Sequence, residues 1–261
     1  METKLIEFKT EFGNILRGIF VDVKSKRGVI CLHGFERNAT AEPKFKFLSD
    51  ALAEKGISSF RFDYTGTGIS DGDFSKLSIE TMTQDLERAI DIFKKELGIK
   101  EFALVSHSLS GCVIGNYLSL GKNLPYKIVL LAPALNQKDL LRYYFVVSNI
   151  KDRNITWNNY QDFLDENAFL KDSKRKNKVA KAHYIGKDYF LENLERDYSN
   201  FFTGFDNVLL IYGDKDVKVP LESLNFDFSN KIIVKDGDHD LEKPDSIKQW
   251  LSKVVDFLVK F

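Results

Sequence analysis

The segment Phe102-Ala-Leu-Val-Ser-His-Ser-Leu-Ser-Gly-Cys112 decides the fold, because an apolar run leads into serine-rich residues and a helical pattern follows at once. The apolar run predicts a buried strand, and residues 109–121 have the spacing of a helix. Ser108 has small residues two positions before and two positions after it, Ser106 and Ser110. This pattern predicts a tight strand-to-helix turn, which holds the central serine hydroxyl above a helix N-terminus.

Three serines in this turn leave its register to be decided. Ser106 as the central residue would need a small residue in place of Leu104, and Ser110 would put the turn too far into the helix. Only Ser108 has small residues on both sides, so we predict Ser108 as the nucleophile. Under a simpler interpretation, Ser110 is only the N-cap of the helix.

The same alternation of strand and helix extends outward from this turn in both directions. Short apolar runs typical of strands buried on both faces lie at 29–32, 57–62, 102–105, 128–131, 208–212 and 232–234. Helical patterns lie at 43–55, 80–97, 109–121 and 246–260. Before them, residues 4–9 and 14–23 alternate polar and apolar side chains, which predicts an antiparallel hairpin. The sequence therefore predicts an α/β fold with a mainly parallel central sheet and helices on both faces.

One interval, between Pro133 and Phe205, contains no buried-strand pattern and is rich in aromatic residues. It is too long for a loop of a compact domain and too aromatic to be disordered. We therefore expect residues 1–133 and 205–261 to form the core domain. Residues 134–204 are expected to form an inserted cap of helices, with a short strand.

A second motif, His33-Gly34-Phe35, directly follows the first buried strand. In sites of this kind, a backbone amide from this loop and the amide after the nucleophile bind the oxyanion. These are the N–H groups of Phe35 and Leu109, and Gly34 lets the chain turn so that the first can point inward. We expect His33 to hold the loop by hydrogen bonds rather than to transfer protons.

Two acids follow the strand at 208–212, where the acid of a Ser-His-Asp triad is expected. Asp214 and Asp216 both qualify by position. The spacing from Gly213 favours Asp216, with Pro220 as the first residue of the next helix. Asp214 is then expected to cap the turn.

The base is predicted by the order of the histidines. Three lie elsewhere, in the oxyanion loop, the serine turn and the cap: His33, His107 and His183. His239 alone follows a strand end after the acid. The order Ser108, Asp216, His239 is that of α/β hydrolases, in which histidine activates the serine to form an acyl-enzyme. This chemistry needs no metal and no cofactor.

Together with the glycine-rich segment 61–74 and the chain length, these motifs resemble the α/β-hydrolase superfamily of serine hydrolases over the whole chain, cap included. Within it the chain is similar to small bacterial feruloyl or cinnamoyl esterases, to monoacylglycerol lipases and to proline-iminopeptidase-like peptidases. Serines replace the glycines that the family has on either side of its nucleophile. The resemblance implies five site residues: nucleophile Ser108, acid Asp216, base His239, and the oxyanion amides of Phe35 and Leu109.

The leading functional hypothesis is a serine carboxylesterase that acts on aryl esters of the hydroxycinnamoyl type or on short-chain esters. The cap aromatics could stack on an aryl acyl group or pack against one another. An aminopeptidase would instead need cap acids to hold a free amino group, and Asp162, Asp165 and Glu166 are available. The fold is also compatible with a monoacylglycerol lipase and with a catalytically inactive binding module.

The amino-acid composition limits the kinds of partner and the cellular location that we expect. In 261 residues, 38 Lys and Arg balance 38 Asp and Glu, which argues against a nucleic-acid partner. No apolar run is long enough to span a bilayer, and the first residues lack the apolar core of a signal peptide. Cys31 and Cys112 lie in apolar segments, as free thiols of a reducing cytoplasm do. We expect a cytoplasmic monomer or homodimer with a small-molecule ester substrate.

Overall fold

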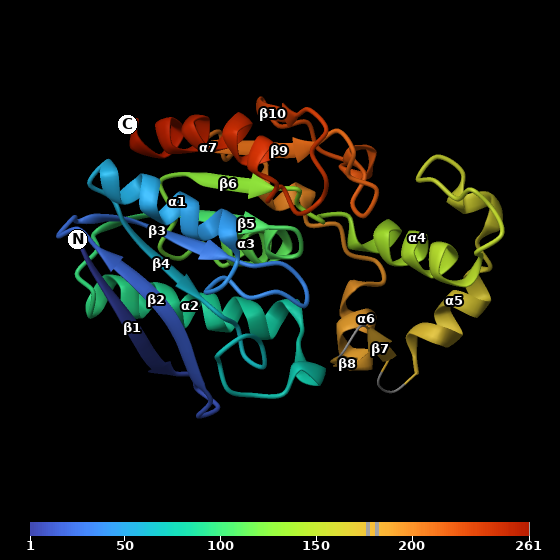
Figure 1. Ribbon diagram of the computed structural model, residues 1–261. Coiled ribbons are helices and arrows are strands. Elements are labelled where there is room, and N and C mark those ends of the chain that lie inside the picture. Colours follow the sequence, from blue (N-terminus) through green and yellow to red (C-terminus); the bar gives the residue numbers. More distant parts are fainter. Residues whose placement is uncertain (176–177, 181–182, 261) are drawn as a thin grey trace.

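The computed structural model describes residues 1–175, 178–180 and 183–260, which surround a central sheet (Figure 1). The sheet has eight strands in the order β1-β2-β4-β3-β5-β6-β9-β10. They are β1 Glu2–Lys9, β2 Ile15–Asp22, β3 Arg27–Leu32, β4 Ser58–Phe62, β5 Glu101–His107, β6 Ile128–Leu131, β9 Val208–Gly213 and β10 Asn230–Val234. The β1–β2 and β2–β4 pairs are antiparallel, and the other neighbours are parallel. The predicted α/β class, with its N-terminal hairpin, is confirmed.

Helices cover both faces of the sheet. Helix α1 (Pro43–Glu54) packs with α7 (Pro244–Val259) on one face, and α2 (Ile79–Lys95) packs with α3 (Ser110–Ser119) on the other (Figure 1). Strands β4, β6 and β9 are buried along their whole length, because both of their faces are covered. No helix in the described part of the chain combines the length and apolar character needed to cross a membrane.

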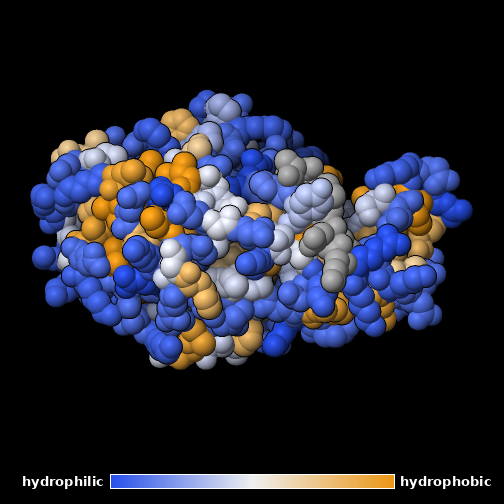
Figure 2. Space-filling model, turned by 90° about the horizontal axis from the view of Figure 1, so that it is seen from below, coloured by the Kyte–Doolittle hydropathy of each residue, from blue (hydrophilic) through white to orange (hydrophobic). Residues whose placement is uncertain are grey.

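The chain between β6 and β9 forms a separate group of elements. They are α4 Gln137–Asn149, α5 Glu166–Ser173, α6 Lys187–Asn193, the antiparallel pair β7 Lys178–Ala180 and β8 His183–Ile185, and the 3-10 turns Tyr160–Phe163 and Ser199–Phe202. This group lies beyond the carboxyl ends of the parallel strands (Figure 1). Seen from below, its outer part protrudes as a smaller lobe at the end of the molecule away from both termini (Figure 2).

The inner part of this group is attached to the core by hydrogen bonds. The Glu192 carboxylate on α6 accepts from the N–H groups of Ile79 and Glu80 at 2.8 and 3.0 Å. A carboxylate at the start of α2 satisfies free N–H groups and complements the helix dipole. The N–H of Gly186 donates to the carbonyl of Ser75 at 3.0 Å. Helix α6 therefore has a defined position next to the start of α2.

The outer lobe has a small hydrophobic cluster of its own. Tyr143, Val146 and Tyr160 are buried there together, and Trp157 packs against the two tyrosines with ring centroids 5.5 and 5.2 Å apart. Some of the aromatic residues between Pro133 and Phe205 thus pack against one another, which is one of the two roles expected for them.

One predicted helix is wrong. The sequence predicts a helix that begins at Pro220, but this residue is followed only by a 3-10 turn, Leu221–Ser223. The ψ of Pro220 is 141°, which is extended, and the chain is extended again at Leu224. A proline suits the first position of a helix, but it does not by itself keep the following residues helical.

Candidate active site

Ser108 lies on the turn between β5 and α3 with a φ of 55°. This left-handed conformation is costly for a residue with a Cβ, and it occurs mainly where the surrounding structure requires it. The Ser108 N–H donates to the carbonyl of Leu131 on β6 at 2.9 Å. Its own carbonyl accepts from Gly111 and Ala134 at 3.0 and 3.1 Å. These backbone hydrogen bonds hold the strained turn in place.

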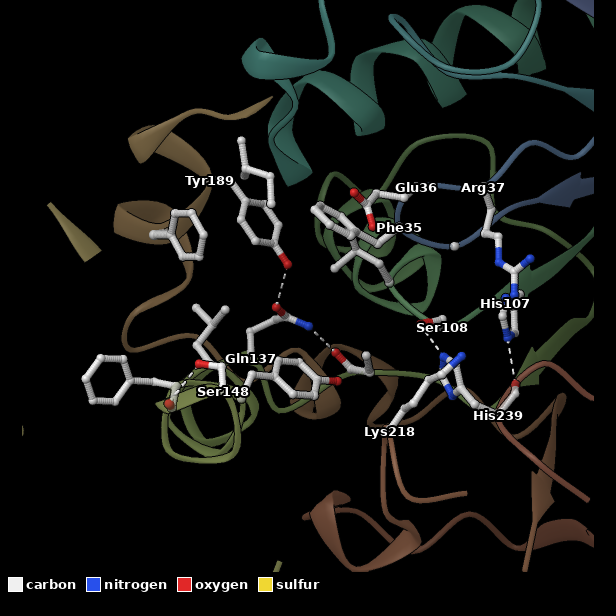
Figure 3. A pocket seen from close by; sticks show the side chains of 18 of the residues that line it. Phe35, Glu36, Arg37, His107, Ser108, Gln137, Ser148, Tyr189, Lys218 and His239 are labelled. Atoms are coloured by element: carbon white, nitrogen blue, oxygen red, sulfur yellow. Dashed lines mark hydrogen bonds between the residues drawn. The ribbon is translucent and has the colours of Figure 1, made fainter. Parts of the chain in front are cut away.

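The structure brings the three predicted triad residues into one hydrogen-bonded series. His239 Nε2 lies 3.0 Å from Ser108 Oγ (Figure 3), and His239 Nδ1 lies 2.7 Å from Asp216 Oδ2. Asp216 follows β9 and His239 follows β10, so both come from the same edge of the sheet as Ser108. Nδ1–H donates to the carboxylate, which leaves the Nε2 lone pair free to accept the serine proton.

The second oxygen of Asp216 fixes the position of the carboxylate. Oδ1 accepts from the N–H groups of Lys218 and Val219, both at 2.9 Å. The sequence predicts that Asp214 caps this turn, yet Asp214 is exposed and its carboxylate accepts no hydrogen bond from the described residues. Asp216 itself caps the turn, since one of its carboxylate oxygens accepts from the histidine and the other accepts from the backbone.

The two predicted oxyanion residues border the same cavity as Ser108. In the described part of the chain, the N–H groups of Phe35 and Leu109 donate no hydrogen bond to another protein group. A Cβ on Gly34 would lie 3.0 Å from both Ser108 Cβ and His107 Nδ1. A side chain at this position would have to push the loop and the serine turn apart by a few tenths of an ångström, so glycine suits this close approach.

His33 is fully buried beneath this loop. Its Nδ1–H donates to the carbonyl of Gly34 at 2.8 Å, and its Nε2 accepts from the N–H of Tyr64 at 3.3 Å. Burial lowers the pKa of His33 to about 4, so the ring is neutral near pH 7. These contacts hold the loop, in keeping with the expectation from the sequence.

His107 has a contact that the sequence did not indicate. Its Nε2–H donates to the backbone carbonyl of His239 at 2.9 Å, and the two rings lie 4.9 Å apart (Figure 3). Burial, together with the positive charge of Lys44, holds the pKa of His107 well below its usual value, so this ring is neutral as well. The only signal in the sequence was its position beside Ser108.

A cavity of about 550 Å³ opens above Ser108. Its wall on the side of the 134–204 segment is mainly apolar, with Leu141, Tyr144, Phe145, Phe169, Ile185, Tyr189 and Phe190, but Gln137, Ser148 and Asp172 also line it. Close to His239 the wall is charged instead, with Arg37, Lys218 and Asp240. In Figure 3, Tyr189 lies to the left of Ser108, Arg37 above it to the right, and Lys218 below it. The serine hydroxyl thus lies between an apolar region and a charged one.

Gln137 joins two elements of the apolar wall. Its Oε1 accepts from the Tyr189 hydroxyl at 3.0 Å, and its Nε2 donates to the carbonyl of Ala134 at 2.6 Å (Figure 3). Because the N–H of Ala134 donates to the carbonyl of Ser108, the wall is connected to the serine turn.

The acids considered for binding an amino group lie away from this cavity. Asp162 is exposed, Asp165 caps α5 by accepting from the N–H of Ala168, and Glu166 is paired with Arg142. The acids among the described lining residues are Glu36, Asp172 and Asp240.

A sheet of this strand order, with a serine at positive φ between β5 and α3, defines an α/β hydrolase. Residues 23–194 match the model of the family described as serine aminopeptidase, S33, and the chain belongs to that family. The expected resemblance to the α/β hydrolases is confirmed. Among curated proteins, none matches the chain by sequence.

Several solved structures share the fold. Est1E from Butyrivibrio proteoclasticus, with ferulic acid bound, is 17% identical with a TM-score of 0.74 over 97% of this chain and 96% of that one. An esterase from Pyrococcus furiosus is 20% identical with a TM-score of 0.68 over 98% and 90%. GrgF, an α/β hydrolase from Penicillium sp. sh18, is 18% identical with a TM-score of 0.70 over 99% and 98%.

Proposed function

We propose that the protein is a serine carboxylic-ester hydrolase that forms an acyl-enzyme on Ser108. The observation that carries the proposal is the hydrogen-bonded series Ser108–His239–Asp216, which opens onto a cavity with an apolar wall. A serine hydroxyl becomes a nucleophile when a neighbouring histidine accepts its proton and a carboxylate orients that histidine.

In this mechanism, His239 Nε2 takes the proton of Ser108 as the oxygen attacks the ester carbonyl. Asp216 stabilises the imidazolium that forms. The N–H groups of Phe35 and Leu109 bind the oxygen that becomes negative. His239 then protonates the leaving alcohol, and water releases the acid by the same steps in reverse.

We propose that the 134–204 segment acts as a cap that receives the acyl group. Its apolar wall, with the rings of Tyr144, Phe145 and Tyr189, suits an aryl acyl group of the hydroxycinnamoyl type. The alcohol would leave on the charged side, next to the proton donor His239. The fold shared with Est1E, whose structure contains ferulic acid, makes hydroxycinnamoyl esters the first substrates to test. Free, buried Cys31 and Cys112 support a cytoplasmic location.

A serine aminopeptidase is the second candidate, because it is the activity in the description of the family. Such an enzyme must bind a free amino group with a carboxylate inside the cavity. The acids foreseen for this task lie outside it. Three other acids, Glu36, Asp172 and Asp240, line the cavity, and Asp240 is paired with Arg37. The ester reaction needs no such group, because the triad and the apolar wall are sufficient for it.

Parallel assays would test the proposal. The purified protein is offered methyl hydroxycinnamates, short-chain aryl esters, a monoacylglycerol and aminoacyl anilides, and is treated separately with a fluorophosphonate. We expect ester hydrolysis and labelling, both absent in Ser108→Ala. Faster cleavage of the anilides would identify an aminopeptidase instead. Failure of every substrate together with the label would identify a binding module.

A further inference from the structure

Ser110, one of the serines that replace the usual glycines, connects the serine turn to the oxyanion loop. Its side chain is fully buried, and its hydroxyl donates to the carbonyl of His33 at 2.5 Å. The Tyr64 hydroxyl lies 3.0 Å from the same oxygen. Because a serine has a single hydroxyl proton, Tyr64 is the donor in the second contact. Ser110 is thus not the N-cap, since that position belongs to Leu109.

On the loop side, these contacts determine the direction of a peptide plane. Ser110 holds the carbonyl of His33, and the His33 ring holds the next carbonyl, that of Gly34. In a trans peptide, the C=O and N–H groups point in opposite directions. A fixed Gly34 carbonyl therefore fixes the direction of the Phe35 N–H.

On the helix side, Ser110 directly follows Leu109, the source of the other proposed oxyanion amide. One buried hydroxyl therefore bridges the two segments that supply the two N–H groups. We infer that Ser110 is a positioning residue that holds the Phe35 N–H at its working distance from the Leu109 N–H. The inference rests on the proposed ester hydrolysis. It adds Ser110 to the residues that determine how tightly the transition state of that reaction is bound.

These hydrogen bonds persist across the working pH range. Tyr64 is fully buried, and burial raises the pKa of its phenol far above the usual value, so the hydroxyl remains a donor. His33, with its pKa of about 4, remains neutral and can accept from the N–H of Tyr64. A loss of the Ser110 contact should thus have the same effect at every pH from about 5 to about 9.

The chain offers a matched control in Ser106. It lies on the other side of Ser108 in the same turn, and it is also fully buried. Its hydroxyl has no hydrogen-bond partner among the described residues. Ser106→Ala and Ser110→Ala therefore remove the same buried atom on either side of Ser108, and only the second change removes hydrogen bonds between described residues.

The experiment compares kcat and KM of both variants from about pH 5 to 9, on an ester that the wild type hydrolyses. Loss of a whole oxyanion donor lowers kcat by about 10²–10³-fold, so a displaced donor should cost about 10–100-fold. We expect this loss in Ser110→Ala, with KM within about twofold of the wild type and an unchanged pH profile, because the donor acts only in the transition state. Ser106→Ala should keep kcat within about twofold.

Tyr64→Phe is the second variant, and it removes only the hydroxyl that donates to Ser110. We expect a smaller fall in kcat, again at constant KM. Equal kcat in Ser110→Ala and Ser106→Ala would overturn the inference, as would a change confined to KM. Should Ser110→Ala not fold, an unchanged kcat in folded Tyr64→Phe would overturn it. A wild type that hydrolyses no ester would sink the proposed function and the inference together.

Discussion

At the scale of single residues, Ser108 has a strained backbone conformation that hydrogen bonds to neighbouring residues hold in place. Its φ of 55° is unfavourable for serine, while three backbone hydrogen bonds, to Leu131, Gly111 and Ala134, keep it there. None of these bonds involves the side chain. The conformation of the turn should therefore survive removal of the hydroxyl, which separates loss of chemistry from loss of fold.

Ser108→Ala is accordingly expected to abolish ester hydrolysis and fluorophosphonate labelling and to leave the melting temperature within a few degrees. The measurements are turnover, intact mass after labelling and thermal unfolding. Ser106→Ala and Ser110→Ala should both still be labelled. Labelling of Ser108→Ala at the wild-type rate would show that the nucleophile is another residue.

The two acids after β9 give a second residue-scale prediction. Asp216→Asn should lower kcat by about 10⁴-fold, because an amide favours the wrong tautomer of His239. Asp214→Asn should change kcat less than twofold, since Asp214 is exposed. Steady-state kinetics on one ester decides between them. A larger loss in Asp214→Asn would reverse the assignment of the acid.

Much of this site could be predicted because it depends on local patterns at strand ends. The ends of parallel strands meet at one edge of the sheet, so Ser108, Asp216 and His239 could be placed together from their order alone. The contacts Ser110–His33 and His107–His239 could not, because no pattern of residues at a strand end indicates them. Their existence depends on how closely loops approach, as the contact of Gly34 with the serine turn illustrates.

At the scale of elements, neighbouring aromatic residues of α4 have two different roles, which the sequence does not distinguish. Tyr144 and Phe145 line the cavity, while Tyr143 packs with Trp157 and Tyr160 in the outer lobe. The aromatic character of the segment was evident from the sequence, but the division was not, because the helical face that each ring occupies depends on packing. The helix predicted to begin at Pro220 is absent for a similar reason: the proline suits a helix start, but the conformation of the residues after it depends on their own contacts.

Substitutions on the two sides of the lobe should therefore have different effects. Tyr144→Ala should change the ratio of kcat/KM between aryl and short aliphatic esters, with little effect on the free energy of unfolding. Tyr160→Ala should lower that free energy by about 2–4 kcal/mol, because it leaves a cavity in a buried cluster, and should keep the substrate ratio. Kinetics on the two esters and urea unfolding check both. The opposite pattern would place the acyl pocket elsewhere.

At the scale of the whole molecule, a buried ion-pair cluster connects the N-terminal half to the loop that carries His239. Lys44 is fully buried between Glu42 and Glu242, at 3.4 and 2.9 Å, and Arg37 pairs with Asp240. The Lys44–Glu242 pair joins the beginning of α1, and the Arg37–Asp240 pair joins the loop before it, to the chain just after the triad histidine. The geometry of the site is thus coupled to a group of charges that are costly to bury.

Glu42 makes this cluster sensitive to pH, since burial raises its pKa to about 7 from an unfolded value near 4.5. Between these values the unfolded chain loses the proton and the folded chain keeps it, so the stability contributed by Glu42 falls as the pH rises. The unfolding free energy of the wild type minus that of Glu42→Gln should therefore drop by about 2–4 kcal/mol from about pH 4.5 to about pH 8. Urea unfolding at both values measures it, and a constant difference would contradict it.

The two hydrophobic clusters also give the protein two intrinsic fluorescent probes, its tryptophans. The chain has 2 tryptophans in different surroundings: Trp250 lies within the core cluster, and Trp157 packs against both the lobe cluster and the core. Trp250 of α7 is fully buried in the core, whereas Trp157 is half-buried in the outer lobe. Trp157→Phe and Trp250→Phe would each leave a single emitter, so fluorescence could follow the lobe and the core independently as substrate binds. Any movement of the outer lobe could thus be timed without an attached dye.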